Sequence, residues 1–160
     1  MSRRKGTKPE QFAGVFQNYG EIPVRYRLET YAQSYRDHDT WSWYLDNVLF
    51  DGGVSDYMYR TAKRVERSWL AHMEQCGRHH ALPTPEYVNK WCFKLREDRS
   101  RKTAYEKYYF YIYNFFEHLK SHSQHPHLYN PLLIAAIQYE ETRDVWQHRI
   151  ESRPEVVGRE

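Results

Sequence analysis

Four basic side chains share one face of a helix that the sequence predicts between residues 55 and 75. They are Arg60, Lys63, Arg64 and Arg67. Spacings of three and four residues bring side chains to the same side of an α-helix. The opposite side carries an apolar stripe of Met58, Ala62, Val65, Trp69 and Met73. A row of cations can neutralise phosphates and release their counterions, so this face predicts binding to a polyanion. An ordinary solvated face is the alternative.

A second basic group lies where a strongly aromatic helix is expected to begin. It comprises Arg99, Ser100, Arg101, Lys102 and Thr103, with Lys107 one turn further on. The N-terminus of a helix presents free N–H groups and the positive end of its dipole, which favour phosphate. We therefore expect this link to contact a nucleic-acid backbone. A solubilising loop is the alternative.

Aromatic residues follow one another closely between positions 108 and 116. There are too many rings for one buried helix face, so we expect core packing together with a second, exposed role. Contact with a protein partner or stacking on single-stranded bases could supply that role.

Two cysteines and two histidines resemble one half of a zinc site. Cys76, His79, His80 and Cys92 contain one close Cys/His pair, but Cys92 falls on the buried stripe of its own helix. A buried cysteine with nearby surface histidines explains the set better, so we predict no metal and no cofactor. Catalytic triad patterns, phosphate-binding loops and HExxH are missing from the sequence, which indicates a protein that is not an enzyme.

The charge distribution supports a polyanion-binding middle. The chain has 160 residues, with 24 Lys+Arg against 21 Asp+Glu and a formal net charge of +3. Residues 1–8 and 55–107 are basic, whereas 9–54 and 131–160 are acidic. No apolar run approaches the ~20 residues that a membrane span requires, and the N-terminus is not a secretory signal. We expect a cytoplasmic, nucleoid-associated protein without membrane contact.

Helical periodicity recurs along the chain, and no segment alternates at period two. Helix starts are predicted at Thr40, Ser55, Thr84 and Asn130, and Gly77 is expected to end the basic helix. The fold class is therefore all-α, an irregular or orthogonal bundle of five to seven helices. We expect a disordered basic arm over 1–20, a helical extension over 21–53, a main domain over 54–139, and a polar C-terminal helix and tail over 140–160.

The main domain resembles a known module in the order of its motifs. These are the Ser55 helix ending in Trp69-Leu70, then Thr84-Pro85-Glu86, then Phe115-Phe116 before Leu119, and finally Asn130-Pro131 before Ala135-Ala136. In this order the segment 54–137 is similar to the SAM-like core-binding domain of tyrosine recombinases, the phage-integrase family, in its archaeal, haloarchaeal-like form. The chain departs from the family at Met58 and Ala62, where the family usually has Thr and Tyr.

The resemblance implies double-stranded DNA binding without strand cleavage, because the family's catalytic His-x-x-Arg box does not occur. Arg60, Lys63, Arg64 and Arg67 would then line the major groove, and residues 99–103 would contact the backbone. The implied role is an accessory factor or regulator of recombination and integration in a virus, provirus or plasmid.

Partners of such a protein would be DNA, a full-length tyrosine recombinase, or a second copy in a homodimer. Trp146 and Ile150 in the acidic C-terminal helix are candidate protein contacts. A transcriptional regulator of the same element, and a protein-interaction module without DNA affinity, remain alternatives.

Overall fold

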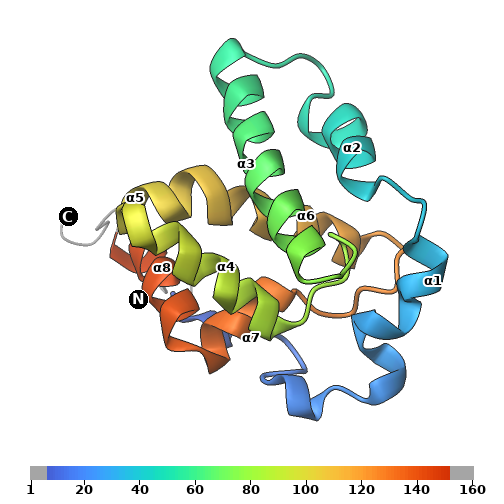
Figure 1. The fold of residues 1–160 in the computed structure, drawn as a ribbon. Helices are drawn as coiled ribbons and strands as arrows, with labels where there is room; N and C mark the ends of the chain where they lie inside the picture. Colours follow the sequence, from blue (N-terminus) through green and yellow to red (C-terminus); the bar gives the residue numbers. More distant parts are fainter. Residues whose placement is uncertain (1–6, 152–160) are drawn as a thin grey trace, which may run out of the picture.

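Helices form all the regular structure in residues 7–151, the range that the computed structural model describes. The α-helices are α1 (Ala32–Tyr35), α2 (Thr40–Tyr44), α3 (Asp56–Gln75), α4 (Pro85–Asp98), α5 (Arg101–Ala104), α6 (Phe110–Ser121), α7 (Pro131–Gln138) and α8 (Glu140–Glu151) (Figure 1). Turns of π-helix at Leu45–Leu49 and Tyr105–Tyr109 extend α2 and join α5 to α6. Turns of 3₁₀-helix occupy Pro9–Gln11, Tyr19–Glu21, Val24–Tyr26 and Leu28–Tyr31.

Joining adjacent turns leaves seven runs that contain α-helix within residues 7–151, and no described residue lies in a strand. The prediction of an all-α bundle of five to seven helices is therefore confirmed.

Side-chain caps fix most helix starts where the sequence predicts them. The hydroxyl of Ser55 accepts a hydrogen bond from the Met58 amide, and Thr84 and Asn130 cap α4 and α7 in the same way. Gly77 has a φ of 68°, the left-handed conformation that follows a helix end and suits glycine. The predicted cap at Thr40 is wrong by one residue, because the carboxylate of Asp39 accepts from the Ser42 amide.

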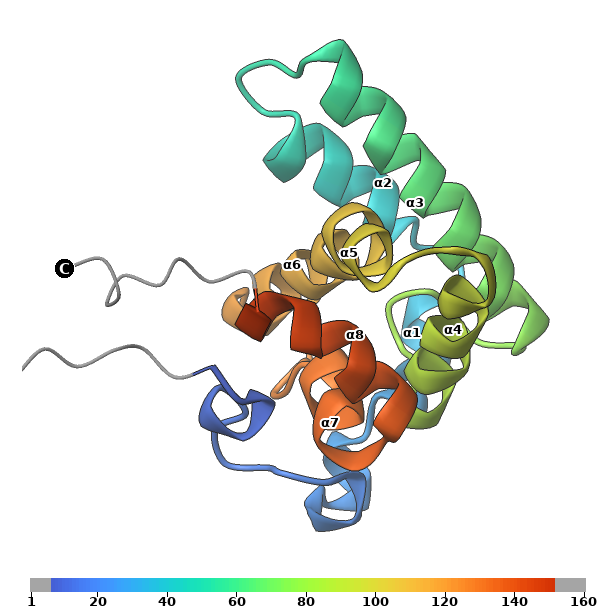
Figure 2. The same cartoon turned by 90° about the vertical axis from the view of Figure 1, so that its left-hand side faces the viewer.

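Helices α2 and α3 lie side by side and extend together away from the group formed by α4, α7 and α8 (Figures 1 and 2). The α5–α6 run passes between the two groups. Only the inner side of α3 is covered by neighbours, where Ala62, Val65, Trp69 and Met73 are buried. The arrangement therefore leaves the opposite side of α3 facing solvent.

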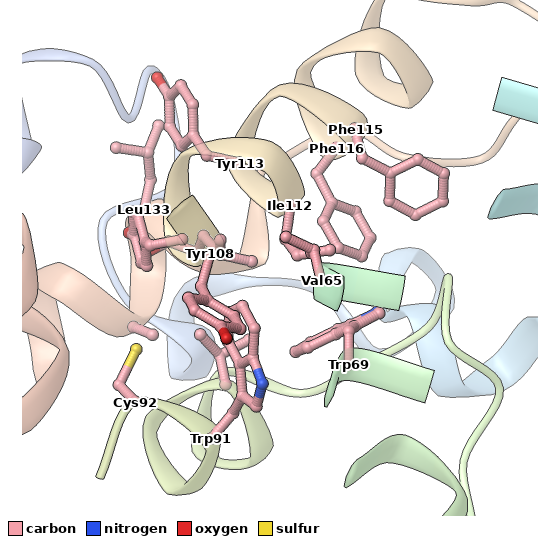
Figure 3. Packing of buried hydrophobic residues seen from close by; sticks show 14 of the residues in the cluster. Val65, Trp69, Trp91, Cys92, Tyr108, Ile112, Tyr113, Phe115, Phe116 and Leu133 are labelled. Atoms are coloured by element: carbon pink, nitrogen blue, oxygen red, sulfur yellow. The ribbon is translucent and has the colours of Figure 1, made fainter. Parts of the chain in front are cut away.

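One hydrophobic core connects both groups of helices. Trp69 of α3 meets Trp91 of α4 edge to face, with ring centroids 4.8 Å apart, and Phe116 of α6 lies 6.3 Å from Trp69 (Figure 3). The same buried cluster runs from Ile22 and Leu28 to Trp146. The expected boundaries near residues 54 and 140 do not separate independent cores.

The N-terminal segment is packed rather than disordered from residue 7 onward. Trp146 donates its indole N–H to the Thr7 carbonyl at 2.8 Å. The guanidinium of Arg143 forms a bidentate ion pair with the Glu10 carboxylate, with N–O distances of 2.9 and 3.0 Å. Phe12 adds an edge contact to Trp146. The expectation of a disordered arm is therefore wrong for residues 7–20, and residues 1–6 lie outside the described range.

The C-terminal helix packs on the core through Trp146, which is therefore not available as the predicted protein contact, whereas the assignment of Ile150 stays a prediction. Trp146 is 0% exposed, and Ile150 is partly buried against the same cluster. The assignment of Trp146 as a surface contact is wrong because its ring faces Phe12, Tyr109 and Tyr113. The predicted tail over 152–160 lies outside the described residues.

Candidate nucleic-acid interface

The outer face of α3 carries the most available positive charge among the described residues. Arg60, Arg64 and Arg67 are exposed, and none of them forms an ion pair with another described residue. Together with Tyr59 and Lys63 they line a shallow hollow on the surface. We call this set of five residues the α3 face.

Helix geometry sets the spacing of these cations. With a rise of 1.5 Å per residue, Arg60, Arg64 and Arg67 stand on successive turns, about 4.5 to 6 Å apart along the axis. The buried stripe on the inner side fixes the rotation of the helix, so these arginines must point outward. Such a row matches a polyanion whose charges also repeat every few ångströms.

Lys63 is less available than the three arginines. Its ammonium lies 3.1 Å from a Glu66 carboxylate oxygen, one helical turn away. Glu66 also accepts the indole N–H of Trp41 in α2 at 3.1 Å. This carboxylate therefore links α3 to α2 and cancels part of the charge on the α3 face.

Two tyrosines on α3 are exposed: Tyr59 belongs to the α3 face, and Tyr57 lies next to it. Tyr57 is 56% exposed and Tyr59 is 47% exposed. Lys107 donates a hydrogen bond to the Tyr57 hydroxyl and lies 4.9 Å from the centre of its ring. The hydrogen bond from this ammonium lowers the pKa of Tyr57 below its ordinary value. The contact brings one further cation, from a distant part of the chain, to the edge of the α3 face.

The predicted link behaves differently, because its arginine is held by carboxylates of α8. Arg101 donates to Asp144 at 2.7 Å and to both oxygens of Glu151 at 3.0 and 3.1 Å. Arg96 donates to the other oxygen of Asp144 at 2.9 Å. Partial burial acts to raise the pKa of Asp144, but the hydrogen bonds from Arg96 and Arg101 outweigh it and lower that pKa. Arg101 is therefore held by two carboxylates within the protein, and its contact with phosphate stays a prediction.

The remaining link residues are also engaged within the protein. Arg99 lies 3.0 Å from Asp98 and covers the Tyr108 ring at 4.6 Å. Lys102 is 3.9 Å from Glu106. The Ser100 hydroxyl accepts from the Thr103 amide at 3.1 Å and so caps α5. The link starts a helix, as predicted, and each of its charged side chains lies near a carboxylate of the protein.

The aromatic run is mostly core. Tyr108, Tyr109, Phe115 and Phe116 are buried, whereas Phe110 is exposed.

Cys92 is a fully buried core residue, and burial raises the pKa of its thiol to about 12. Within residues 7–151, no three His, Cys, Asp or Glu side chains are arranged to hold a metal ion.

Tyr57, Tyr59 and Glu66 were not among the residues predicted from the sequence. Tyr57 precedes Arg60 by three residues and Arg64 by seven, so helical spacing could have placed it beside the basic row. No local signal indicates that Lys107 meets Tyr57, because 50 positions separate them.

The fold and this surface define an all-α protein with an exposed basic helix. Protein-family models, curated proteins and solved structures contain no match to this chain. Across residues 7–151, helices long and apolar enough to cross a membrane are absent.

Proposed function

We propose that this chain binds double-stranded DNA through the α3 face, as a non-catalytic protein of the cytoplasm and nucleoid. The observation that carries the proposal is the row of Arg60, Arg64 and Arg67, exposed and without carboxylate partners in the described part of the chain. An α-helix fits the major groove of B-DNA, which is about 12 Å wide. Helix α3 extends away from the group formed by α4, α7 and α8 (Figure 1), and its three arginines are exposed, which supports access by a duplex.

The narrower proposal is a role in site-specific recombination, as an accessory factor or regulator. It rests on the order of motifs in residues 54–137, which resembles the core-binding domain of tyrosine recombinases. Joint retention of this chain and a full-length tyrosine recombinase on one duplex would support it. Binding to DNA with no effect on recombinase assembly or activity would reject this narrower role alone.

Salt-dependent binding to a fluorescently labelled duplex tests the broader proposal. Replacing Arg60, Arg64 and Arg67 together by Ala should lower the slope of log K against log salt by about 2 to 3, and weaken binding roughly 100- to 1,000-fold near 0.1 M salt. The matched control replaces Arg25, Arg36 and Lys90, three exposed cations on other elements, by Ala.

The control changes the net charge equally and should weaken binding only a few-fold. Equal losses for both triple variants would show that net charge, rather than the α3 face, governs binding. Failure of the wild-type chain to bind duplex DNA at low salt would refute the proposal. In that case exposed Tyr57 and Tyr59 would make the same face a candidate protein contact, because Tyr is enriched at interfaces.

A further inference from the structure

Seven of the nine histidines gather where four segments meet. They come from the loop before α2, the turn between α3 and α4, the end of α6, and the loop before α7: His38, His79, His80, His118, His122, His125 and His127. Their rings form a chain of neighbours, with His79 and His80 stacked at 4.1 Å and His125 5.8 Å from both His122 and His127. Imidazole is the side chain whose charge changes between about pH 5 and 8.

Backbone hydrogen bonds fix the stacked pair in its neutral form. The Trp41 amide donates to Nε2 of His80 at 3.0 Å, and the Ala81 amide donates to Nδ1 of His79 at 2.9 Å. A ring nitrogen that accepts an N–H bond cannot also carry a proton. His79 therefore carries its proton on Nε2, where it donates to the His38 carbonyl at 2.8 Å, and neutral His80 carries its proton on Nδ1.

We propose that the His79–His80 pair is an acid-sensitive joint, which holds the segment from Tyr35 to Tyr44 against the α3–α4 turn while both rings are neutral and releases it when they are protonated. Protonation would turn both accepting nitrogens into donors that face the Trp41 and Ala81 N–H groups. The conflict at His80 breaks its bond to Trp41 across the joint, and the conflict at His79 breaks its bond to Ala81, which orients the His79 ring within the turn. Two adjacent positive rings also repel each other.

The surroundings offer little compensation for positive charge. The groups that act on the pair are Tyr35, His38 and Asp39 before α2 and His127 before α7. Around them, Glu66 accepts the indole N–H of Trp41, His125 contacts Tyr35 and His127, and Arg78 in the α3–α4 turn lies 3.9 Å from Glu29. Asp39 is the acid that acts directly on both rings, whereas the neighbouring histidines oppose their protonation. Burial, followed by the charges of its neighbours, lowers the pKa of His80 to about 3.

His127 strengthens the same joint from the loop before α7. Its Nε2 donates to the Ala81 carbonyl at 2.7 Å, and its buried Nδ1 has no partner among the described residues. Burial lowers the pKa of His127 to about 4. A proton on Nδ1 would place an unpaired charge in the interior. Acid therefore destabilises the contacts of both the Ala81 amide, with His79, and the Ala81 carbonyl, with His127.

The lowered pKa values of His79, His80 and His127 set the direction in which pH changes the stability of the closed joint. Each ring takes up a proton more readily in the opened joint, where its pKa returns to about 6.5, so the closed joint is favoured fully above pH 6.5 and progressively less below it. His80 alone should raise the opening constant about thirtyfold between pH 8 and pH 5.

Nuclear magnetic resonance on the full chain tests the joint without any variant. Ring ¹⁵N spectra near pH 7 should show the Nε2–H form of His79 and the Nδ1–H form of His80. Exchange of the Trp41 amide with solvent, corrected for the intrinsic rate, should then rise about thirtyfold from pH 8 to pH 5, while the Ile112 amide in α6 stays protected. The inference is independent of DNA binding, so these spectra are recorded without DNA.

Two variants sharpen the test. His80→Gln and His79→Asn replace each accepting nitrogen by an amide oxygen that does not titrate, and together they should remove most of the pH dependence of Trp41 exchange. His148→Gln is the control, because His148 pairs with Glu106 away from the joint. Titration of His80 near pH 6.5 with Trp41 still protected would overturn the proposal, as would simultaneous loss of Ile112 protection or the opposite tautomers.

Discussion

The α3 face and the link at residues 99–103 look alike in the sequence but differ in the structure. Both are short rows of Arg and Lys on a helix or at its start. On α3 the arginines have no carboxylate partners among the described residues, whereas Arg101 in the link is held by Asp144 and Glu151 of α8. Two basic rows that look alike in the sequence therefore differ in how much of their charge is neutralised by carboxylates of another helix.

The two regions differ because of what packs against them. Helix α8 lies along α5 and presents acids 43 and 50 positions away from Arg101. Helices α4 and α6 and the π-turn at Tyr105–Tyr109 contact α3, and α2 lies beside it (Figures 1 and 2), whereas Arg60, Arg64 and Arg67 stay exposed among the described residues. A phosphate approaching Arg101 must displace two carboxylates, whereas one approaching Arg64 displaces water.

The largest expected loss of stability follows from removing Trp146, the residue that anchors α8 in the core. Trp146→Ala removes a fully buried ring and its hydrogen bond to Thr7, so the free energy of unfolding should fall by about 3 to 5 kcal/mol. Urea unfolding followed by circular dichroism measures the change. Trp43→Ala, at a residue that is 42% exposed, is the control and should cost clearly less. Similar losses for the two variants would contradict the placement of α8 in the core.

A smaller difference in unfolding free energy is expected between Arg101, which is held by carboxylates, and Arg64 on the α3 face. Arg101→Ala should lower the free energy of unfolding by about 1 kcal/mol, because a partly exposed ion network is screened by solvent. Arg64→Ala should change it by less than about 0.5 kcal/mol, since the side chain forms no ion pair or hydrogen bond with residues 7–151. Urea unfolding at low and high salt checks both values. An Arg64 variant that is destabilised as much as the Arg101 variant would show that the α3 face is structural.

The smallest effect tests the carboxylate beside Lys63. Glu66→Gln keeps an acceptor for the Trp41 indole but removes the negative charge from the α3 face. Affinity for duplex DNA should rise about threefold at low salt, and the slope of log K against log salt should steepen by up to about 1. Glu86→Gln on α4 is the control, because it frees Lys90 on a different helix. Unchanged affinity would place the duplex away from Lys63.

The fold class could be predicted because local signals agreed with one another. Ser55, Thr84 and Asn130 each precede an apolar periodic stretch, and all three cap the expected helices. The cap before α2 was assigned one residue late because Asp39 and Thr40 are both good capping residues, so the sequence alone does not choose between them.

The candidate site could be predicted only where it lies on one helix. The spacing of Arg60, Arg64 and Arg67 is a local property, so the α3 face follows from helical periodicity. The engagement of Arg101 depends on the docking of α8, which no local pattern encodes. Trp146 was expected at the surface because its helix is polar overall, yet its ring reaches the core between Phe12 and Tyr113.

Chemical-shift mapping with a short duplex tests the central claim most directly. The claim predicts that added DNA shifts the amide signals of α3 from Tyr57 to Ala71 and the side-chain signals of Arg60, Arg64 and Arg67. The signals of Arg101 and of its partners Asp144 and Glu151 should stay in place. Shifts centred on residues 99–103 and α8, with α3 unaffected, would contradict the account.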